Sequence, residues 1–256
     1  WLVPPTGGSV HLEGVELGQL TKKELRQARR EIQMVFQDPY GSLNPRQPVG
    51  SAIAEPLTIH RIGTAQERTD KVAALMESVG LRPDDVSRYP HQFSGGQRQR
   101  IAIAIAIALE PKIIVADEPV SALDVSVQSQ VLNLLSDLKD AHGLTFLFIS
   151  HDLTVVRHFA DRVAVMYLGK IVEEGAVSDV FEHPKHPYTQ ALIAAAPKIG
   201  QGKRTPGSAL KGDVPSLLNP PSGCAFHPRC PVAVDRCRTE APLLKANVAC
   251  HLLDEG

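Results

Sequence analysis

Short apolar segments rich in β-branched residues alternate with helix-forming segments in the middle of this chain. Residues 112–116 and 145–149 each read as one short strand, and residues 125–141 between them favour a helix. A strand, a helix and a second strand in this order are typical of a βαβ unit, in which the strands are parallel. A helix over 153–159 and a strand over 162–167 continue the pattern. The sequence therefore predicts an α/β fold with a parallel sheet.

Composition excludes several classes of protein. Hydrophobic residues make up 43% of the 256 residues and charged residues 21%, which allows a sizeable core and argues against global disorder. The 27 Lys and Arg balance the 28 Asp and Glu, so we expect no nucleic-acid partner. The longest apolar run spans only residues 101–109, whereas a membrane-spanning helix needs about 20 residues. Because no secretory signal opens the chain, a cytoplasmic location is expected.

Three other segments give local predictions. Residues 32–36 read as a buried strand that ends at Gln37. Residues 101–108 alternate Ile with Ala, which favours a strand by its period and a helix by its alanine content, and the pattern leaves both open. Residues 42–91 are mostly helical, and their apolar stripe consists of Val72, Leu75, Met76 and Val79.

Two consecutive carboxylates follow the apolar segment that ends at residue 116. Ligands of open α/β folds bind at the carboxyl edge of the sheet, where Asp117 can hold Mg²⁺ and Glu118 can polarise an attacking water. Two solvated acids at a strand end are the alternative. His151 also follows a strand, although a lone histidine there is more often structural than catalytic.

A glycine-rich segment at residues 93–100 leads into the Ile/Ala stretch. Ser94 is a favourable helix N-cap, and Gly95 and Gly96 would let a phosphate approach backbone N–H groups at a helix start. A flexible loop is the alternative, but a loop seldom runs directly into a long segment of helix formers.

Together these motifs resemble those of the ATP-binding subunit of an ABC transporter. Residues 93–97 are similar to the signature motif, 113–118 to the Walker B strand and 121–124 to the D-loop. His151 resembles the switch histidine, and Gln37 resembles the Q-loop glutamine. The resemblance implies a P-loop-NTPase-like ABC ATPase core of the α/β class with a helical subdomain.

Longer segments narrow the resemblance to dipeptide and oligopeptide importers, of which nickel importers are close relatives. They are residues 37–46, residues 117–126 (DEPVSALDVS), residues 186–192 (HPYTQAL) and residues 219–226 near the C-terminus. The resemblance covers essentially the whole chain.

The resemblance implies a role for each candidate residue, with ATP held between two subunits and Mg²⁺ beside it. Glu118 would polarise the attacking water, and His151 would contact the γ-phosphate. Asp117 and Gln37 would place and sense Mg²⁺. The residues expected to reach the opposing nucleotide or the dimer interface are Ser94, Gly95, Gly96, Gln97 and Asp124.

Two features depart from the family pattern. No G-x-x-x-x-G-K-[ST] motif occurs in the 256 residues, so we expect the phosphate-binding loop to lie upstream of Trp1. The chain as printed is accordingly expected to bind ATP poorly and to be inactive alone. Ile105 stands where the family commonly carries an arginine.

The C-terminal part differs in composition from the rest. We predict an N-terminally truncated ATPase domain over 1–196, with the helical subdomain at about 42–110, and an oligopeptide-transporter-type extension over 197–256. The extension holds 8 of the 20 prolines and every cysteine. A segment with so little apolar periodicity is not expected to fold without a staple.

The cysteines are Cys224, Cys230, Cys237 and Cys250. Their spacing lacks the C-x2-C knuckle of a zinc ribbon, and disulfides are disfavoured in a reducing compartment. The resemblance implies a 4Fe–4S cluster on these four thiolates, with zinc as the alternative. His227 and His251 lie near the cysteines and are substitute ligand candidates.

The implied function is that of an ATPase, a translocase subunit that energises import of di- or oligopeptides from the inner face of the cell membrane. Expected partners are a second ATPase subunit, identical or not, two transmembrane permease subunits and, indirectly, an extracytoplasmic peptide-binding protein. The alternatives are an importer of nickel or another solute, a soluble ABC ATPase without transport, and a metal-binding remnant.

Overall fold

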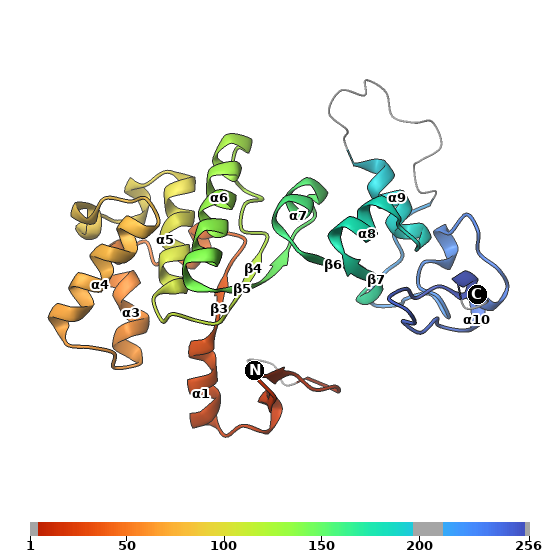
Figure 1. Ribbon diagram of the computed structural model, residues 1–256, viewed down its shortest axis with the longest axis horizontal. Coiled ribbons are helices and arrows are strands. Elements are labelled where there is room, and N and C mark those ends of the chain that lie inside the picture. Colours follow the sequence, from red (N-terminus) through yellow and green to blue (C-terminus); the bar gives the residue numbers. More distant parts are fainter. Residues whose placement is uncertain (1–4, 197–211, 254–256) are drawn as a thin grey trace. The chain divides into compact units, whose positions relative to one another are not determined.

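The computed structural model describes residues 5–196 and 212–253. The chain divides into two compact units, Trp1–His151 and Asp152–Gly256, which are described separately below (Figure 1). The domain boundary predicted between residues 196 and 197 adjoins the segment 197–211, which is outside the described residues. That boundary therefore stays a prediction.

The first unit contains a three-stranded parallel sheet in the order β3-β4-β5 (Figure 1). The strands are β3 (Ile32–Val35), β4 (Ile113–Asp117) and β5 (Thr145–Ile149). Helix α6 (Val125–His142) links β4 to β5, and its C-cap is Gly143, whose φ of 61° lies in the left-handed region. The predicted parallel α/β arrangement is confirmed for these strands.

The two faces of this sheet are buried to different extents. Ile114 and Ala116 on one face of β4 have no exposed surface. The other face carries the cross-strand row Met34, Val115 and Leu147. Met34 is 40% exposed and Leu147 is 59% exposed, so this second face is open to solvent within the described chain.

The Ile/Ala stretch forms part of helix α5 (Gly95–Ile107). A capping box starts the helix: Ser94 Oγ accepts from the Gln97 N–H, and Gln97 Oε1 accepts from the Ser94 N–H. Ile and Ala are both apolar and this helix is buried nearly all round, so their alternation carried no information about a strand. The buried apolar residues are Ile101, Ala102, Ile103, Ala104, Ala106 and Ile107.

Helices α3 (Val49–Ile59) and α4 (Ala65–Ser78) pack against α5 and against each other (Figure 1). Thr64 caps α4 through a capping box with Glu67. The predicted apolar stripe is confirmed, because its four residues are all buried. The short elements near these helices are α2 (Pro39–Ser42), η2 (Pro83–Ser87) and η3 (Pro90–Gln92).

The N-terminal part of this unit is a small hairpin followed by a helix. Strands β1 (His11–Leu12) and β2 (Val15–Glu16) pair antiparallel across Glu13 and Gly14, which both have positive φ. The 3-10 turn η1 (Leu17–Gln19) then leads to α1 (Lys22–Glu31).

The second unit is built on an antiparallel hairpin, which corrects one prediction. Strand β6 (Arg162–Tyr167) does not continue the parallel sheet but pairs with β7 (Lys170–Ala176). Leu168 and Gly169 both have positive φ and form the two-residue reversal, a geometry that favours tight hairpins. The helices of this unit are α7 (Leu153–Phe159), α8 (Val177–Glu182), α9 (Pro187–Ala195) and α10 (Arg236–Thr239), with 3-10 turns η4 (His227–Arg229) and η5 (His251–Leu253).

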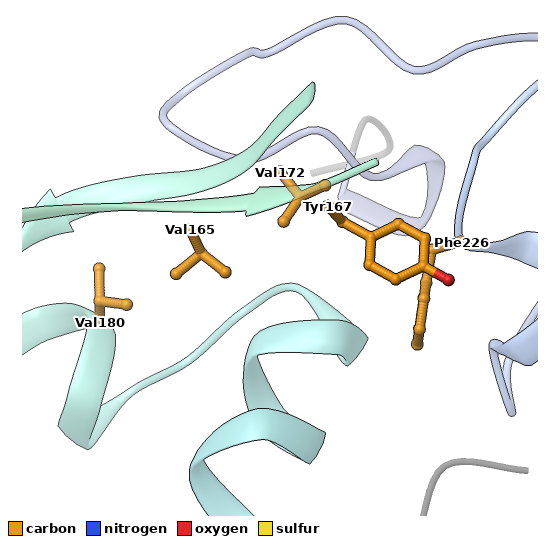
Figure 2. Packing of buried hydrophobic residues seen from close by; sticks show 5 residues of the cluster. All are labelled: Val165, Tyr167, Val172, Val180 and Phe226. Atoms are coloured by element: carbon orange, nitrogen blue, oxygen red, sulfur yellow. The ribbon is translucent and has the colours of Figure 1, made fainter. Parts of the chain in front are cut away.

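The described part of the tail packs on this hairpin. Phe226, which is 1% exposed, lies edge-on to Tyr167 with ring centroids 5.2 Å apart (Figure 2). The same small core contains Val165, Val172 and Val180 from the hairpin and α8 (Figure 2). The tail has too little apolar periodicity to form a core of its own. Its Phe226 instead packs into a core that β6, β7 and the helices beside them provide.

Within residues 5–196 and 212–253, no helix combines the length and the apolar character that a bilayer crossing requires.

Candidate active site

The parallel register of β3 and β4 places Gln37 beside Glu118. Val35 pairs with Ala116, and each candidate lies two residues beyond its paired residue. Parallel strands end at the same edge of the sheet, so a side chain just past one strand meets a side chain just past the other.

The register of β4 and β5 brings His151 to the same edge. Asp117 pairs with Ile149, the last residue of β5, and His151 lies two positions beyond it. The backbone N–H of Glu118 also donates to the carbonyl of Ile149 at 2.9 Å, which extends the contact beyond the strands.

Glu118 is the centre of the hydrogen bonds at this edge. Gln37 Nε2 donates to Glu118 Oε2 at 2.8 Å, and His151 Nδ1 lies 2.9 Å from Glu118 Oε1. The Glu118 side chain is 23% exposed, whereas that of His151 is 72% exposed. Both carboxylate oxygens are therefore oriented by neighbours while solvent still reaches the group.

The backbone of Glu118 is in an uncommon conformation. Its φ of 44° lies in the left-handed region, which costs a non-glycine residue about 1–3 kcal/mol. The following turns hold it in place, since Ser121 N–H and Oγ both bond to the Glu118 carbonyl. Such strain is typical of residues that are positioned for function.

Asp117 is the last residue of β4 and is half-buried. It lies two positions after Val115, so the two side chains are on the same face of the sheet. It therefore belongs to the solvent-open face of the sheet, with its carboxylate near the edge that carries Glu118. Carboxylates are ligands that Mg²⁺ prefers.

The glycines of the signature segment allow α5 to approach the start of α6. A methyl group on Gly96 would lie 2.4 Å from Cγ1 of Val127, which is not tolerated without movement. A methyl group on Gly95 would lie 3.6 Å from Leu123 Cδ2, an ordinary contact. The signature glycines thus pack beside the predicted D-loop.

Asp124 is the N-cap of α6, and its carbonyl accepts from the Gln128 N–H at 2.8 Å. Gln128 Nε2 in turn donates to the Val120 carbonyl at 3.0 Å. These bonds connect α6 to the turns that follow Glu118, so Glu118 and Asp124 belong to one ordered segment.

The four cysteines share one local environment in the second unit. All carry thiols rather than disulfides; Cys237 is buried and the other three are half-buried. Burial raises the pKa of Cys224 and of Cys230, and the neighbouring thiols raise both further. A backbone bond from Cys224 N–H to the Cys237 carbonyl at 2.9 Å joins two of these segments.

These thiols do not form a ligand set as they stand. Among the described residues, no three or more His, Cys, Asp or Glu side chains converge as a metal would require. His227 Nδ1 lies 2.9 Å from the Cys224 carbonyl, and His251 Nε2 lies 2.9 Å from the Glu240 carbonyl. The 4Fe–4S and zinc assignments therefore stay predictions.

Sequence reasoning missed a buried polar pair in the second unit. Glu173 accepts from the backbone N–H groups of Lys185 and His186, at 2.8 and 2.9 Å. His186 is 1% exposed and caps α9 by accepting from the Tyr188 N–H. Burial lowers the pKa of His186 to about 4, although Glu173 opposes the shift. The sequence feature that could have indicated this pair is Glu173, an acidic residue within a segment that forms a strand.

Comparison with known proteins identifies related chains. Residues 2–121 match the ABC transporter family, and residues 172–237 match the C-terminal region of oligopeptide/dipeptide transporters. A di/tripeptide transport ATP-binding protein of Pseudomonas aeruginosa is 53% identical over 96% of this chain and 78% of its own length. An oligopeptide transport ATP-binding protein of Bacillus subtilis is 52% identical over 98% of this chain and 79% of its own.

Solved structures give the same fold. The dimer of an ATP-binding cassette in a post-hydrolysis state with ADP and Pi has a TM-score of 0.61 and 32% identity, over 69% of this chain and 76% of that one. The cbiO1 protein of Clostridium perfringens, part of an ABC transporter complex, has a TM-score of 0.64 and 26% identity, over 71% of each chain. The predicted ABC ATPase fold is confirmed.

Proposed function

Because this chain belongs to the family of ATP-binding proteins of dipeptide and oligopeptide ABC transporters, we propose that it hydrolyses ATP to energise the import of di- or oligopeptides. The observation that carries this proposal is the hydrogen-bonded group of Gln37, Glu118 and His151 at the carboxyl edge of the sheet. Two residues that are distant from Glu118 in sequence, Gln37 and His151, converge there on its carboxylate.

Glu118 is the proposed general base. Its carboxylate is partly shielded and oriented on both oxygens, which suits a group that takes a proton from an attacking water. His151 lies at the more exposed side of the same group, where it would contact the transferred phosphate. Gln37 restricts the rotation of the carboxylate.

The oxygen donors at this edge fit Mg²⁺. Asp117 ends β4 on the open face and supplies a carboxylate, and the side-chain oxygen of Gln37 supplies a second oxygen donor. A bound Mg²⁺ would neutralise charge on the phosphates during phosphoryl transfer. Asp117 would hold the ion, and Gln37 would connect it to Glu118.

The phosphate-binding lysine of a Walker A loop is not among the 256 residues. Hydrolysis is therefore proposed for a protein in which a Walker A loop accompanies the residues described above.

The start of α5 and the D-loop are proposed to face a second ATPase subunit. Gly95 and Gly96, which directly follow the Ser94 cap, present backbone N–H groups at a helix start, which favours binding of an anionic phosphate. Asp124 lies in the segment that packs beside them and would cross the dimer interface. Two permease subunits would complete the transporter at the inner face of the membrane, with the helical segment over 42–91 as their docking region.

The tail is proposed to bind an iron–sulfur cluster, with zinc as the alternative. The supporting observation is that the four thiols lie close enough for the neighbouring thiols to add to the burial that raises the pKa of Cys224 and of Cys230. Binding requires these thiols to lose their protons and move together, because no three of them converge in the described structure. Any such metal would link the tail segments, and no catalytic step depends on it.

Uptake into proteoliposomes tests the proposed function. The full protein, with a Walker A loop, its permease partners and the peptide-binding protein outside the vesicles, should import a labelled dipeptide or tripeptide only when ATP is inside. Glu118→Gln should abolish that uptake. Uptake of Ni²⁺ without peptide would contradict the substrate class, and ATP hydrolysis without uptake of either would favour a non-transport ATPase.

A further inference from the structure

A buried arginine on α5 holds the loop that leads into Ser94. Arg98 is only 8% exposed, and its Nε donates to the Pro90 carbonyl at 2.7 Å. Its Nη2 lies 3.5 Å from the His91 carbonyl. We propose that Arg98 is a positioning residue for ATP hydrolysis: by fixing residues 89–93 it sets the placement of Ser94. This inference rests on the proposed function.

The loop is held from its other end by a second arginine. Arg88 Nη2 donates to the Gln92 carbonyl at 2.8 Å, and its guanidinium lies 4.9 Å from the centroid of the Phe93 ring. The carbonyls of Pro90, His91 and Gln92 are thus each met by a guanidinium. Three successive backbone acceptors fixed in this way leave the chain little freedom before the helix begins.

Arg98 also belongs to the cap that it supports. Its backbone N–H donates to the Ser94 carbonyl at 2.9 Å, while its side chain reaches back to the loop before Ser94. One residue therefore joins the incoming loop to the first helical turn. Hydrogen bonds from a charged donor are stronger than neutral ones, so this link is stiffer than the capping box alone.

Placement of Ser94 matters because reacting groups tolerate little displacement. A shift of about 1 Å in a positioning contact can cost about 100-fold in rate. The signature end of α5 is proposed to meet the nucleotide of the opposing subunit, so its misplacement would affect the closed dimer. Binding of ATP to the Walker A side of the same subunit uses other residues and would persist.

Arg100 provides a matched control in the same helix. It lies two positions further on, and its Nη1 donates to the Val79 carbonyl at 2.7 Å rather than to the loop before Ser94. Removing either guanidinium deletes a charged donor to a backbone carbonyl. Only the Arg98 change releases the loop.

The experiment compares Arg98→Met, Arg98→Lys and Arg100→Met in the full protein with its Walker A loop. We expect kcat of Arg98→Met to fall about tenfold or more, with the affinity of the single subunit for ATP unchanged. Lysine should restore part of the rate because it retains a charged donor. Arg100→Met should keep both values near the parent.

Amide hydrogen exchange tests the same inference without a measurement of ATP hydrolysis. Exchange at residues 91–97 should quicken in Arg98→Met and stay at the parent rate in Arg100→Met. The positioning role would be overturned if Arg98→Met and Arg100→Met had the same kcat and the same exchange rates. This holds whether both variants match the parent or both lose the same share of its activity. If the parent itself did not hydrolyse ATP, the proposed function would fail, and the exchange comparison would still decide whether Arg98 fixes the loop.

Discussion

The Nε2 atom of Gln37 and the Oε2 atom of Glu118 lie 2.8 Å apart, although 81 residues separate them in the chain. The parallel pairing of β3 with β4 is sufficient to explain this, because each residue lies two positions beyond a paired strand residue. The Glu118 carboxylate, which follows β4, is therefore oriented by the Gln37 amide, which follows β3. Its chemistry depends on the register as much as on the residue itself.

Replacing Glu118 by glutamine should slow ATP hydrolysis by about 100-fold or more, the range expected when a general base is lost. Glutamine keeps the size of the side chain and can still bond to Gln37, so binding of ATP should persist. An ATP-stabilised dimer should accumulate, which size-exclusion chromatography can detect. The measurements need a protein that contains a Walker A loop.

The exposed Glu77 gives the control for that change, since Glu77→Gln removes a carboxylate on α4, a helix that carries none of the proposed catalytic residues. Its turnover should match the parent. A Glu118→Gln variant that also turned over like the parent would show that another residue is the base.

A side chain at Gly96 should separate α5 from α6. The added methyl of Gly96→Ala would lie 2.4 Å from Val127 Cγ1, and overpacking of this kind costs about 1–3 kcal/mol. The urea midpoint should fall accordingly, and Val127→Ala in the same chain should recover much of the loss because it removes the clashing atom. Gly95→Ala, with 3.6 Å of separation from Leu123, is the control and should change the midpoint little. A Gly96→Ala midpoint equal to that of Gly95→Ala would contradict the tight approach.

Local sequence signals predicted the elements of the first unit well where only one structure fitted the pattern. The strand before Asp117 and the stripe on α4 are such cases. The Ile/Ala stretch left strand and helix open because the period of a strand is visible only when the alternate residues are polar. In α5 both residue types are buried, so the capping box at Ser94 was the better indication of a helix.

The second unit shows what sequence could not supply. Strand β6 was expected in the parallel sheet because it follows a helix, yet the reversal at Leu168 and Gly169 pairs it with β7 instead. The tail was judged by its own composition, whereas Phe226 packs into a core that the hairpin provides. Contacts between distant segments decided both features, and neither leaves a local pattern.

The neutral state of His186 should make stability depend on pH. Its pKa falls from an ordinary value of 6.5 to about 4 on burial, so the unfolded chain binds the extra proton between these values. This contribution is fully present above about pH 6.5 and is lost as pH falls towards 4. Between pH 7 and pH 5 the loss is about 2 kcal/mol.

Urea midpoints at pH 7 and pH 5 measure this loss. His186→Asn can still cap α9 and cannot titrate, so its midpoint should change less with pH than that of the parent. His183→Asn, which alters an exposed histidine, should behave like the parent. The account is wrong if His186→Asn and the parent lose the same stability on acidification.

The cysteine tail has little core of its own, and either a bound metal or packing on the hairpin could hold it in place. The raised pKa values of Cys224 and Cys230 keep these thiols protonated near neutral pH, so they should react slowly with iodoacetamide in the metal-free protein. If the tail binds a cluster, anaerobically purified full protein should contain iron and sulfide and absorb broadly in the visible, and Cys230→Ser should bleach it. Colourless protein with one zinc per chain would show that the tail binds zinc rather than an iron–sulfur cluster.

Proteolysis of the tail then distinguishes the contribution of a bound metal from that of packing on the hairpin. Phe226→Ala removes the ring that meets Tyr167 but no thiol. If packing on the hairpin is sufficient, the tail of metal-free protein should resist a protease and become sensitive only in Phe226→Ala. If the metal is the staple, Cys230→Ser alone should expose it, because binding energy is then folding energy. The buried position of Phe226, at 1% exposure, leads us to expect that Phe226→Ala has the larger effect on cleavage and Cys230→Ser the larger effect on metal content.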